Sequence, residues 1–476
     1  MYDLIVKNGF VVGPQASMHA DVAVAKGIIA AVVPPGRLNS DAVEQIDAAG
    51  KIVVPGGIDP HIHAKSPLFD ASGFSGYTQG IEDVSRAAVH GGTTMLIDFA
   101  IQGSDEMLEQ AVQRREADFS GKSFCDYAYH LWLNSAVSQR TLDEIPHMVA
   151  AGYPSVKIFM TDITPSRRGR KLSLGDIWEV LQRVAKAGGI AAIHAEDDEL
   201  VMHMYERLKR EGRMHFRNMA EVHNTLSEDL AFRRIIGLAE HIEGAALYLM
   251  HVSAKTGVDA IAESRAKGYP IYGETLHQYA LYSSDAYARP HGQIYHTYPS
   301  LKSDRDRRAL WDGMVDGTIA TVATDELCTS LETKLHGERI DDVTGGNSGV
   351  EPRMGIMYTE AVVRRGFRLE QFVDLTSANA ARLMGLYPKK GALAPGSDAD
   401  ICIIDPGAKF VLHNDRLHET DYTPWEGWNI EGWPTTTIVG GVVVVRDGNL
   451  LTERRAGQWV SRKLSESVLF GPPARY

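Results

Sequence analysis

The chain has 476 residues, of which 44% are hydrophobic and 23% are charged, enough for one large hydrophobic core and a smaller second domain. Its formal net charge of −12 disfavours nucleic acid and anionic membranes as partners and favours a small-molecule substrate. The three cysteines, Cys125, Cys328 and Cys402, lie far apart without a C-x-x-C spacing, so we expect no disulfide framework, no thiolate zinc site and a reducing, cytoplasmic location.

Residues 1–54 are predicted to form short strands separated by glycine and asparagine. Apolar, β-branched runs at 4–6, 10–12, 22–25, 28–33 and 52–54 carry this prediction. The N-terminus has no basic region followed by a long apolar run, so we expect no targeting segment. No stretch of the chain reaches the roughly 18 uninterrupted apolar residues that a membrane span requires.

Residues 55–388 change to apolar strands that alternate with amphipathic helical stretches, a pattern typical of a parallel α/β fold. Eight strands with intervening helices over this length favour a (β/α)8 TIM barrel over an open sheet. Counting the run that precedes residue 55 as the first, the eight predicted strands are 52–54, 93–99, 127–133, 156–160, 190–193, 246–250, 270–273 and 319–323.

From about residue 389 the chain returns to strand character. Apolar runs occur at 399–405 and 435–445, and a turn is predicted at 447–449. We predict that residues 1–54 and 389–476 together form a small, discontinuous β-sandwich domain, and that its two halves flank the barrel of residues 55–388 in the sequence.

Two histidines stand at the end of the first predicted barrel strand. His61 and His63 follow the apolar run 52–54 and a Pro-Gly-Gly turn. Residues two apart in an extended chain point to the same side, so both imidazoles can converge on one cation while Ile62 points into the packing. An H-x-H pair also arises by chance in a chain with 18 histidines, so the pair alone does not establish a metal site.

Four further polar side chains interrupt apolar strands or end them. Lys157 lies inside SVKIFM, and three other residues each end a strand: His194, His251 and Asp325. Taken singly, the histidines are compatible with core positions and Asp325 with a helix cap. Lys157 is harder to explain structurally, because a buried, unpaired ammonium costs several kcal/mol or loses its charge.

Together, four imidazoles, one carboxylate and one lysine would meet at the same end of strands 1, 4, 5, 6 and 8, the end at which barrel enzymes assemble their sites. Imidazole and carboxylate ligands without thiolates suit Zn²⁺ or a similar divalent cation that keeps open positions for water and substrate.

The chain resembles the amidohydrolase superfamily, within the cyclic amidase group of hydantoinases, dihydropyrimidinases and allantoinases. The motifs that carry the resemblance run nearly from end to end: GGIDPHIH, GGTTMLIDF, VKIFM, IHAED, MHVSA, YGET, TDELCT, GVEPR, SANAARLMGL, KGALAPGSDADI and EGW.

The resemblance implies a site with two divalent metal ions, most simply Zn²⁺. By it, His61, His63 and Asp325 bind one ion, His194 and His251 bind the other, and Lys157 bridges both as an N6-carboxylysine. Such ions lower the pKa of bound water from about 16 to about 7. Asp325 would be the catalytic residue that accepts a proton from this water and passes it to the departing ring nitrogen. The resemblance also implies a homo-oligomer, either a tetramer or a dimer.

Three positions depart from the pattern of the group. Many members carry a tyrosine five residues after the bridging lysine, where this chain has Asp162, and an ionised carboxylate cannot donate to an oxyanion. Glu326 replaces the usual His or Asn after the aspartate, and His277 replaces a proline in GETLHQY. We therefore treat Asp162, Glu326 and His277 as candidate substrate contacts.

The segment SRRGRK at 166–171 is expected in the loop after the fourth barrel strand, on the active-site face. One interpretation is a solvated basic loop. The other is that Arg167, Arg168 or Arg170 binds an acidic group on the substrate, because a guanidinium matches a carboxylate bidentately. Asp98, His130 and Cys328 are interpreted as structural.

Two classes of function remain open from the sequence. The first is a binuclear metal-dependent cyclic amidohydrolase, either hydantoinase- or dihydropyrimidinase-like or, as alternatives, an allantoinase, an imidase or a dihydroorotase-like enzyme. The second is a non-catalytic, dihydropyrimidinase-related oligomeric scaffold. Retention of all six potential ligands favours the enzyme.

Overall fold

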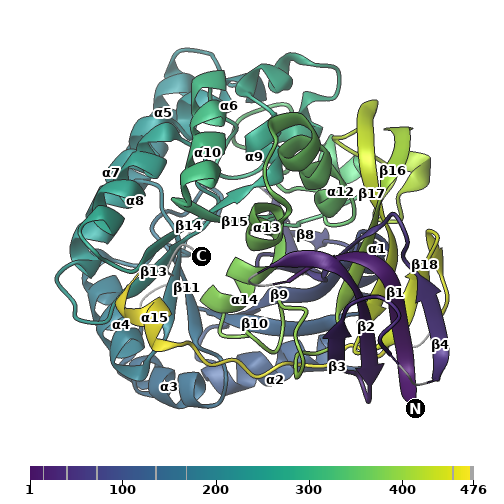
Figure 1. Cartoon of the computed structure of the whole chain (residues 1–476). Helices are drawn as coiled ribbons and strands as arrows, with labels where there is room; N and C mark the ends of the chain where they lie inside the picture. The colour runs from purple at the N-terminus through teal and green to yellow at the C-terminus, as the bar shows by residue number, and fades with distance from the viewer. Residues whose placement is uncertain are drawn as a thin grey trace.

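Eight parallel strands form a barrel in this computed structural model, which describes residues 1–13, 16–38, 41–70, 73–134, 137–167, 169–452 and 455–471. Each strand pairs with the next one along the chain, and the (β/α)8 barrel predicted from the sequence is confirmed (Figure 1). The strands are β6 (Gly57–Asp59), β9 (Thr93–Ile101), β10 (Asp126–Trp132), β11 (Ser155–Phe159), β12 (Ile190–His194), β13 (Ala246–Leu249), β14 (Ile271–Leu276) and β15 (Ile319–Ala323).

The barrel closes through contacts between its first and last strands. Asp59, at the end of β6, accepts hydrogen bonds from the backbone N–H and the hydroxyl of Thr324. Slightly further along both segments, Ile62 and Glu326 form an isolated parallel bridge. This closure brings the residues that follow β6 beside the residues that follow β15.

Helices cover the outside of the barrel (Figure 1). The four-turn helix α4 (Leu174–Ala187) illustrates how the sequence specifies such a helix. The side chain of Ser173 caps its start, and Gly188, with a φ of +75°, ends it. Its apolar face, with residues such as Ile177 and Leu181, is buried. The others are α1 (Ile81–His90), α2 (Leu108–Phe119), α3 (Gln139–Ala150), α5 (Asp198–Arg210), α6 (Met219–Val222), α7 (Thr225–Ala239), α8 (Lys255–Ala266), α9 (His277–Leu281), α10 (Asp304–Asp316), α11 (Leu331–Lys334), α12 (Arg353–Met357), α13 (Leu369–Val373), α14 (Asn379–Leu383) and α15 (Glu466–Phe470).

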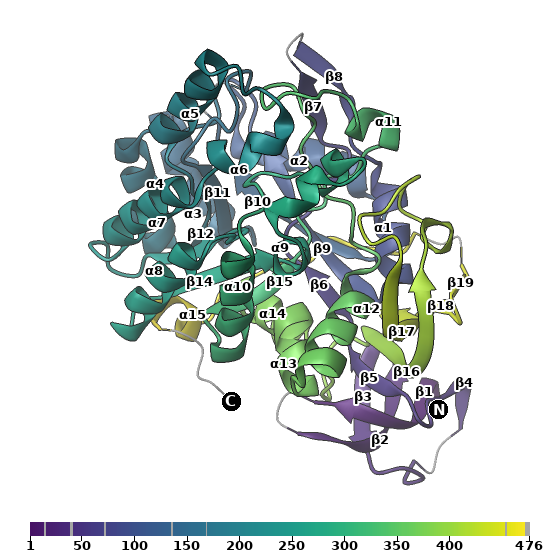
Figure 2. The same ribbon diagram turned by 90° about the horizontal axis from the view of Figure 1, so that it is seen from above.

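Both ends of the chain contribute to a second, nine-stranded sheet, as predicted (Figure 2). The N-terminal half supplies β1 (Tyr2–Val12), β2 (Ser17–Ala25), β3 (Ile28–Val33), β4 (Ala42–Asp47) and β5 (Ile52–Pro55), and the C-terminal half supplies β16 (Ile401–Leu412), β17 (Trp428–Val439), β18 (Val442–Arg446) and β19 (Asn449–Leu450). The halves join where β5 and β16 run antiparallel, with Val53 opposite Ile403. Both residues belong to a separate hydrophobic core that only this domain contributes to.

One strand prediction was wrong. The run 52–54, predicted as the first barrel strand, is β5 of the nine-stranded sheet, and the barrel begins at Gly57. The chain changes sheets at Gly56, where an added Cβ would lie 2.1 Å from Thr94 Oγ1, so only glycine allows this close passage. The domain boundaries at 54/55 and 388/389 stay a prediction.

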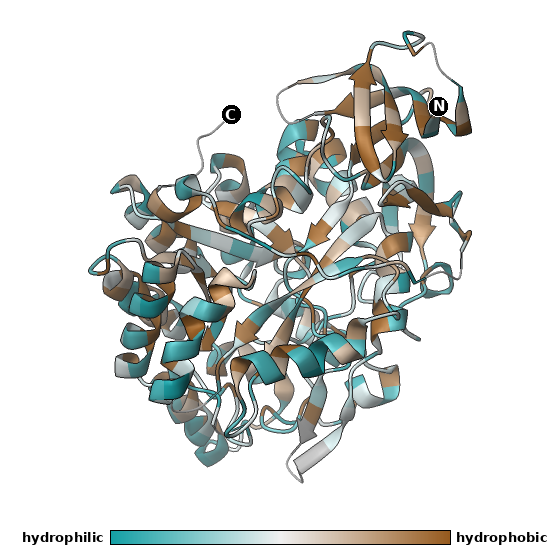
Figure 3. Cartoon of the chain, turned by 90° about the horizontal axis from the view of Figure 1, so that it is seen from below, coloured by the Kyte–Doolittle hydropathy of each residue, from teal (hydrophilic) through white to brown (hydrophobic). Residues whose placement is uncertain are grey.

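Hydrophobic residues concentrate on the strands of both sheets, whereas the helices around the barrel carry hydrophilic stretches outward (Figure 3). A short hairpin, β7 (Pro67–Asp70) and β8 (Gly73–Tyr77), extends from the loop after β6. Among the described residues, no helix combines the length and the apolar character needed to cross a membrane.

Candidate metal centre

One cavity at the carboxyl ends of the barrel strands contains every side chain that the sequence proposed as a metal ligand. Two follow β6, one lies in β11, one ends β12, and two follow β13 and β15. The six are His61, His63, Lys157, His194, His251 and Asp325. All are buried, so their polar atoms face each other or the cavity rather than bulk water.

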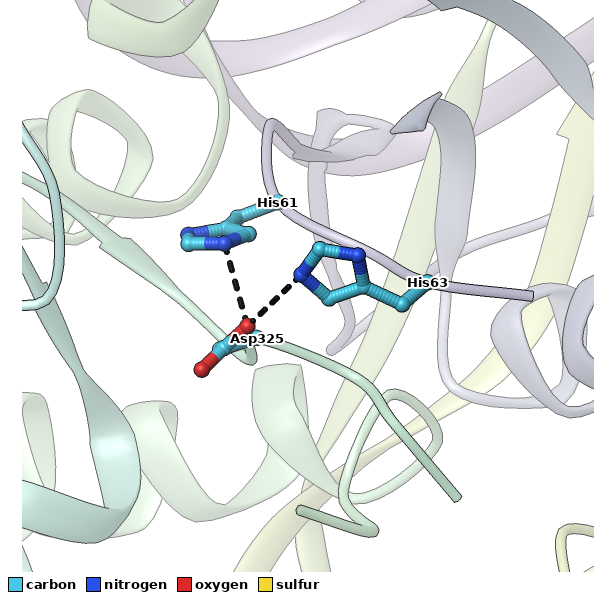
Figure 4. A group of neighbouring side chains, drawn as sticks. All are labelled: His61, His63 and Asp325. Carbon is cyan, nitrogen blue, oxygen red and sulfur yellow. Dashed lines mark ion pairs between the residues drawn. The ribbon is translucent and has the colours of Figure 1, made fainter. Parts of the chain in front are cut away.

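His61, His63 and Asp325 converge on one point (Figure 4). Asp325 Oδ1 lies 3.0 Å from His61 Nε2 and 3.1 Å from His63 Nε2. Two imidazole nitrogens and a carboxylate oxygen at this spacing form a ligand group of the kind that Zn²⁺ prefers.

The backbone explains this convergence. The N–H of His63 donates to the carbonyl of Glu326 at 2.6 Å, which fixes the H-x-H segment against the residue after Asp325. Asp325 has a φ of +50° and His251 a φ of +42°, a conformation that non-glycine residues rarely adopt. Strained backbone of this kind concentrates at functional sites, where the surrounding structure holds it in place.

Glu274 orients His61 from behind. Its Oε1 lies 2.7 Å from His61 Nδ1, which leaves Nε2 directed at Asp325. Glu274 also accepts hydrogen bonds from the hydroxyl of Tyr248 and the backbone N–H of His251. Burial alone would lower the pKa of His61, but the carboxylates of Asp325 and Glu274 raise it to about 9. A position that attracts a proton this strongly also attracts a cation.

His194 and His251 form the second imidazole pair. Their ring centroids lie 4.5 Å apart, and the rings are nearly perpendicular. His194 Nε2 lies 3.0 Å from Glu196 Oε2, and the other oxygen of Glu196 lies 2.9 Å from His223 Nδ1. Burial lowers the pKa of His194 to about 4, so the ring is neutral and able to act as a ligand at physiological pH.

Sequence reasoning did not single out Glu274, Glu196 or His223. A signal was present for the two glutamates, because each is an acidic residue inside or just after an apolar barrel strand, within YGET and IHAED. Carboxylates that hold the far nitrogen of a ligand histidine fix its tautomer and raise its basicity.

Lys157 lines the same cavity as the two imidazole pairs and forms no ion pair with a carboxylate of the described residues. Its Nζ contacts Met250 Sδ at 2.9 Å and lies 4.7 Å from the ring centroid of Phe159. Burial lowers the pKa of Lys157 to about 8 against the opposing charges of Asp325 and Glu274, so more of this amine is neutral near physiological pH than in an exposed lysine. A neutral amine is the form that reacts with CO₂, and the residues present therefore fit a carboxylated lysine between two metal ions.

Of the proposed substrate residues, Arg167 and Arg170 line the same cavity as the six potential ligands. Asp162 does not line it. Instead, its Oδ1 accepts the backbone N–H groups of Gly169, Arg170 and Lys171 and so shapes the loop. Arg168 lies outside the described residues.

Glu326 and His277 are buried beside the cavity rather than in its lining. Glu326 accepts the backbone N–H groups of Gly349 and Val350 and faces Glu419, and burial followed by the charge of Glu419 raises the pKa of Glu326 well above its usual range. His277 stacks on Trp425 at 4.7 Å. Both residues therefore support neighbouring segments.

The residues interpreted as structural support the segment that carries the H-x-H pair. Asp98 accepts the backbone N–H of Ala64, and His130 Nε2 lies 2.8 Å from the carbonyl of Pro60. Cys328 is buried, and burial raises the pKa of its thiol well above the usual value, so it is not an activated nucleophile.

Comparison with known proteins gives consistent results. Residues 52–444 match the model of the amidohydrolase family. A D-hydantoinase of Streptomyces coelicolor is 33% identical over 468 residues, which cover 96% of this chain and 97% of that protein. A D-phenylhydantoinase of Escherichia coli is 32% identical over 471 residues, 97% of this chain and 98% of that protein. The crystal structure of a dihydropyrimidinase from Brevibacillus agri superposes with a TM-score of 0.91 at 30% identity and covers 98% of this chain and 99% of that one.

Proposed function

The chain belongs to the amidohydrolase family, and we propose that it opens the ring of a small cyclic ureide or imide by hydrolysing one ring amide, as a hydantoinase- or dihydropyrimidinase-like enzyme. The observation that carries this proposal is the convergence of four imidazoles, one carboxylate and one buried lysine in a single cavity at the carboxyl ends of the barrel strands.

Two divalent metal ions would be held there. His61, His63 and Asp325 form the group that supports one of them. His194 and His251 would hold the second, and Lys157, carboxylated on Nζ, would contact both. Zn²⁺ suits this donor set best, since it is rich in nitrogen and free of thiolates. When bound, such ions lower the pKa of a water molecule and polarise a carbonyl group.

Asp325 is placed to move the proton. Burial opposes its ionisation, but the imidazoles of His61 and His63 hold the pKa of this carboxyl well below its usual range, so it is an anion at neutral pH. Its second oxygen faces Thr297 Oγ1 at 3.5 Å. We propose that Asp325 accepts a proton from the attacking water and delivers it to the ring nitrogen as the C–N bond breaks.

The first test is metal content by elemental analysis, followed by hydrolysis of hydantoin, dihydrouracil, allantoin, succinimide and dihydroorotate. We expect about two ions per chain, loss of turnover on chelation, and its return on reloading. Asp325→Asn should abolish turnover, whereas Asp143→Asn, which changes an exposed carboxylate on α3, should not.

The preferred ring separates the alternatives within this class, because allantoinase, imidase and dihydroorotase-like activities each predict a different best substrate. A chain that binds no metal and stays inert after loading with zinc and bicarbonate would instead be a scaffold. The similarity to proteins named as hydantoinases favours the enzyme over the scaffold.

We also propose a reducing, cytoplasmic setting and a homo-oligomer. All three cysteines are free and buried, which suits a reducing compartment. Light scattering on the purified protein distinguishes a dimer or tetramer from a monomer.

A further inference from the structure

The loop after β11, described at residues 162–167 and 169–171, carries two arginines to the mouth of the metal cavity. Arg167 and Arg170 line both this cavity and the wider cleft that leads outward from it. Any substrate that reaches the six potential ligands through this cleft passes these two guanidinium groups.

Hydrogen bonds to the rest of the protein and within the loop hold its described residues in place. Asp162 Oδ1 accepts three consecutive backbone N–H groups, including that of Arg170 at 2.9 Å. The backbone N–H of Leu172 donates to Phe159 O at 3.0 Å, and Lys171 Nζ donates to Asp198 Oδ2 at 2.5 Å. Asp162 therefore organises the described residues of this loop.

Aromatic rings hold each guanidinium close to the potential ligands. Arg170 lies 5.3 Å from the ring centroid of Trp132, which stacks on Phe159, which in turn stacks on His194, with 4.7 Å between centroids at both steps. Arg167 lies 5.6 Å from the ring centroid of Tyr298, whose neighbour Thr297 contacts Asp325. Both cations are thus separated from potential metal ligands by one or two side chains.

Three other cations that line the same cleft are paired with carboxylates, unlike Arg167 and Arg170. Lys65, Arg114 and Arg115 each pair with a carboxylate: Asp118, Glu106 and Asp98, respectively. Neither Arg167 nor Arg170 forms an ion pair with a carboxylate of the described residues. Burial, and then the charge of Arg167, lowers the pKa of Arg170 to about 9, although the charge of Asp162 acts in the opposite direction. Two like charges held together at a cavity mouth attract an anion.

We propose that Arg167 and Arg170 bind a carboxylate on a short side arm of the ring substrate. The inference rests on the proposed function and names its substrate class: a cyclic ureide with an acidic substituent. Hydrolysis adds water across one ring C–N bond, with OH to the carbonyl carbon and H to the nitrogen. The product is an N-carbamoyl amino acid that carries two carboxylates.

The test compares two substrates that differ only in charge: hydantoin with a propionate arm at C5, and the same ring with the corresponding carboxamide. We expect the wild-type enzyme to prefer the acid. Arg167→Gln and Arg170→Gln should each reduce kcat/KM for the acid about 10- to 100-fold, mainly through KM, and change the carboxamide little. Arg210→Gln, which removes an exposed charge at the end of α5, away from both the cavity and the cleft, should change neither substrate.

Equal losses on both substrates would overturn the proposal, because they would mean that the arginines act on the ring or on the fold. A wild-type preference for the carboxamide would overturn it too. If the proposed hydrolase function itself is wrong, the metal-loaded protein would open none of the rings, including that of unsubstituted hydantoin. In that case calorimetry with N-carbamoylglutamate and N-carbamoylglutamine still tests the arginines, and the inference requires tighter binding of the former that is lost in both variants.

Discussion

Lys390 Nζ, buried between the two domains, lies 2.6 Å from Asp400 Oδ2. It also lies 2.5 Å from Asp126 Oδ2, at the start of barrel strand β10, and 2.9 Å from Asp398 Oδ2, near the start of β16. One ammonium group therefore pairs with a carboxylate of the barrel and with two carboxylates beside the nine-stranded sheet. Burial opposes its charge, but Asp400, Asp126 and Asp398 hold its pKa above the usual value.

Lys390→Met is expected to lower the free energy of unfolding by about 3–5 kcal/mol, because it leaves buried carboxylates without a counter-ion. Urea unfolding at neutral pH measures the change. The matched control is Lys389→Met, which removes a more exposed ammonium whose one ion pair among the described residues is with Asp398, and it should cost less than about 1 kcal/mol. Similar losses for the two variants would contradict the interpretation.

Glu274→Gln is expected to weaken binding of one metal ion about 10- to 100-fold, because a neutral amide no longer fixes and polarises the ring of His61. Competition with a coloured chelator measures the affinity of each site. Glu116→Gln is the control: Glu116 also accepts hydrogen bonds from buried groups, the hydroxyls of Tyr127 and Tyr129, but it contacts no potential ligand. Unchanged affinity in Glu274→Gln would remove this glutamate from the metal centre.

Lys157 should require CO₂ to support two metal ions. Metal-free protein reloaded with zinc in CO₂-free buffer is expected to regain turnover more slowly, and to hold less metal, than protein reloaded with bicarbonate. Lys157→Arg, which keeps the charge but cannot be carboxylated in this way, should show no bicarbonate effect on metal content. Identical loading of the wild type in the two buffers would argue for an unmodified lysine.

His90 should make the protein sensitive to acid. It ends α1, lies near Arg86 and stacks on His418 at 3.6 Å, while His418 pairs with Glu351. Burial, followed by the charges of His418 and Arg86, lowers the pKa of His90 to about 4. Between pH 6.5 and pH 4 the unfolded chain binds a proton that the folded chain does not, so stability is lost as the pH falls through this window.

His90→Gln is therefore expected to retain about 1–2 kcal/mol more of its neutral-pH stability at pH 4.5 than the wild type does. Parallel denaturant curves at pH 7 and pH 4.5 give the difference. His203→Gln, at an exposed position on α5, should behave like the wild type. If His90→Gln and the wild type lose stability equally, then His90 is protonated in the folded protein.

The barrel and the six potential ligands could be anticipated because both leave local signals. Apolar runs mark the strands, and a residue such as Lys157 or His251 attracts notice because it interrupts or ends such a run. The same reasoning named Arg167 and Arg170 in only one of two interpretations of the basic loop, because the sequence does not show that Trp132 and Tyr298 hold their guanidinium groups at the cavity.

The sequence did not predict which sheet the run 52–54 joins or which residue orients His61, because both depend on contacts between distant parts of the chain. The apolar run 52–54 signals a strand but not the sheet it joins, and that choice depends on β16, far along the chain. The partnership of Glu274 with His61 joins residues 213 positions apart, through the pairing of several strands. The resemblance to the family marked Glu326 and His277 as departures from its pattern, but only their contacts in the fold show that they support neighbouring segments and do not line the cavity.

The pairing of β5 with β16 has a consequence for how the protein is made. A ribosome delivers β5 before the barrel and β16 only after it, so the nine-stranded sheet keeps an open edge throughout most of synthesis. Open strand edges recruit other strands, including those of neighbouring nascent chains. We therefore expect truncated chains that stop before β16 to aggregate or to stay bound to chaperones, even though every barrel strand is already present in them.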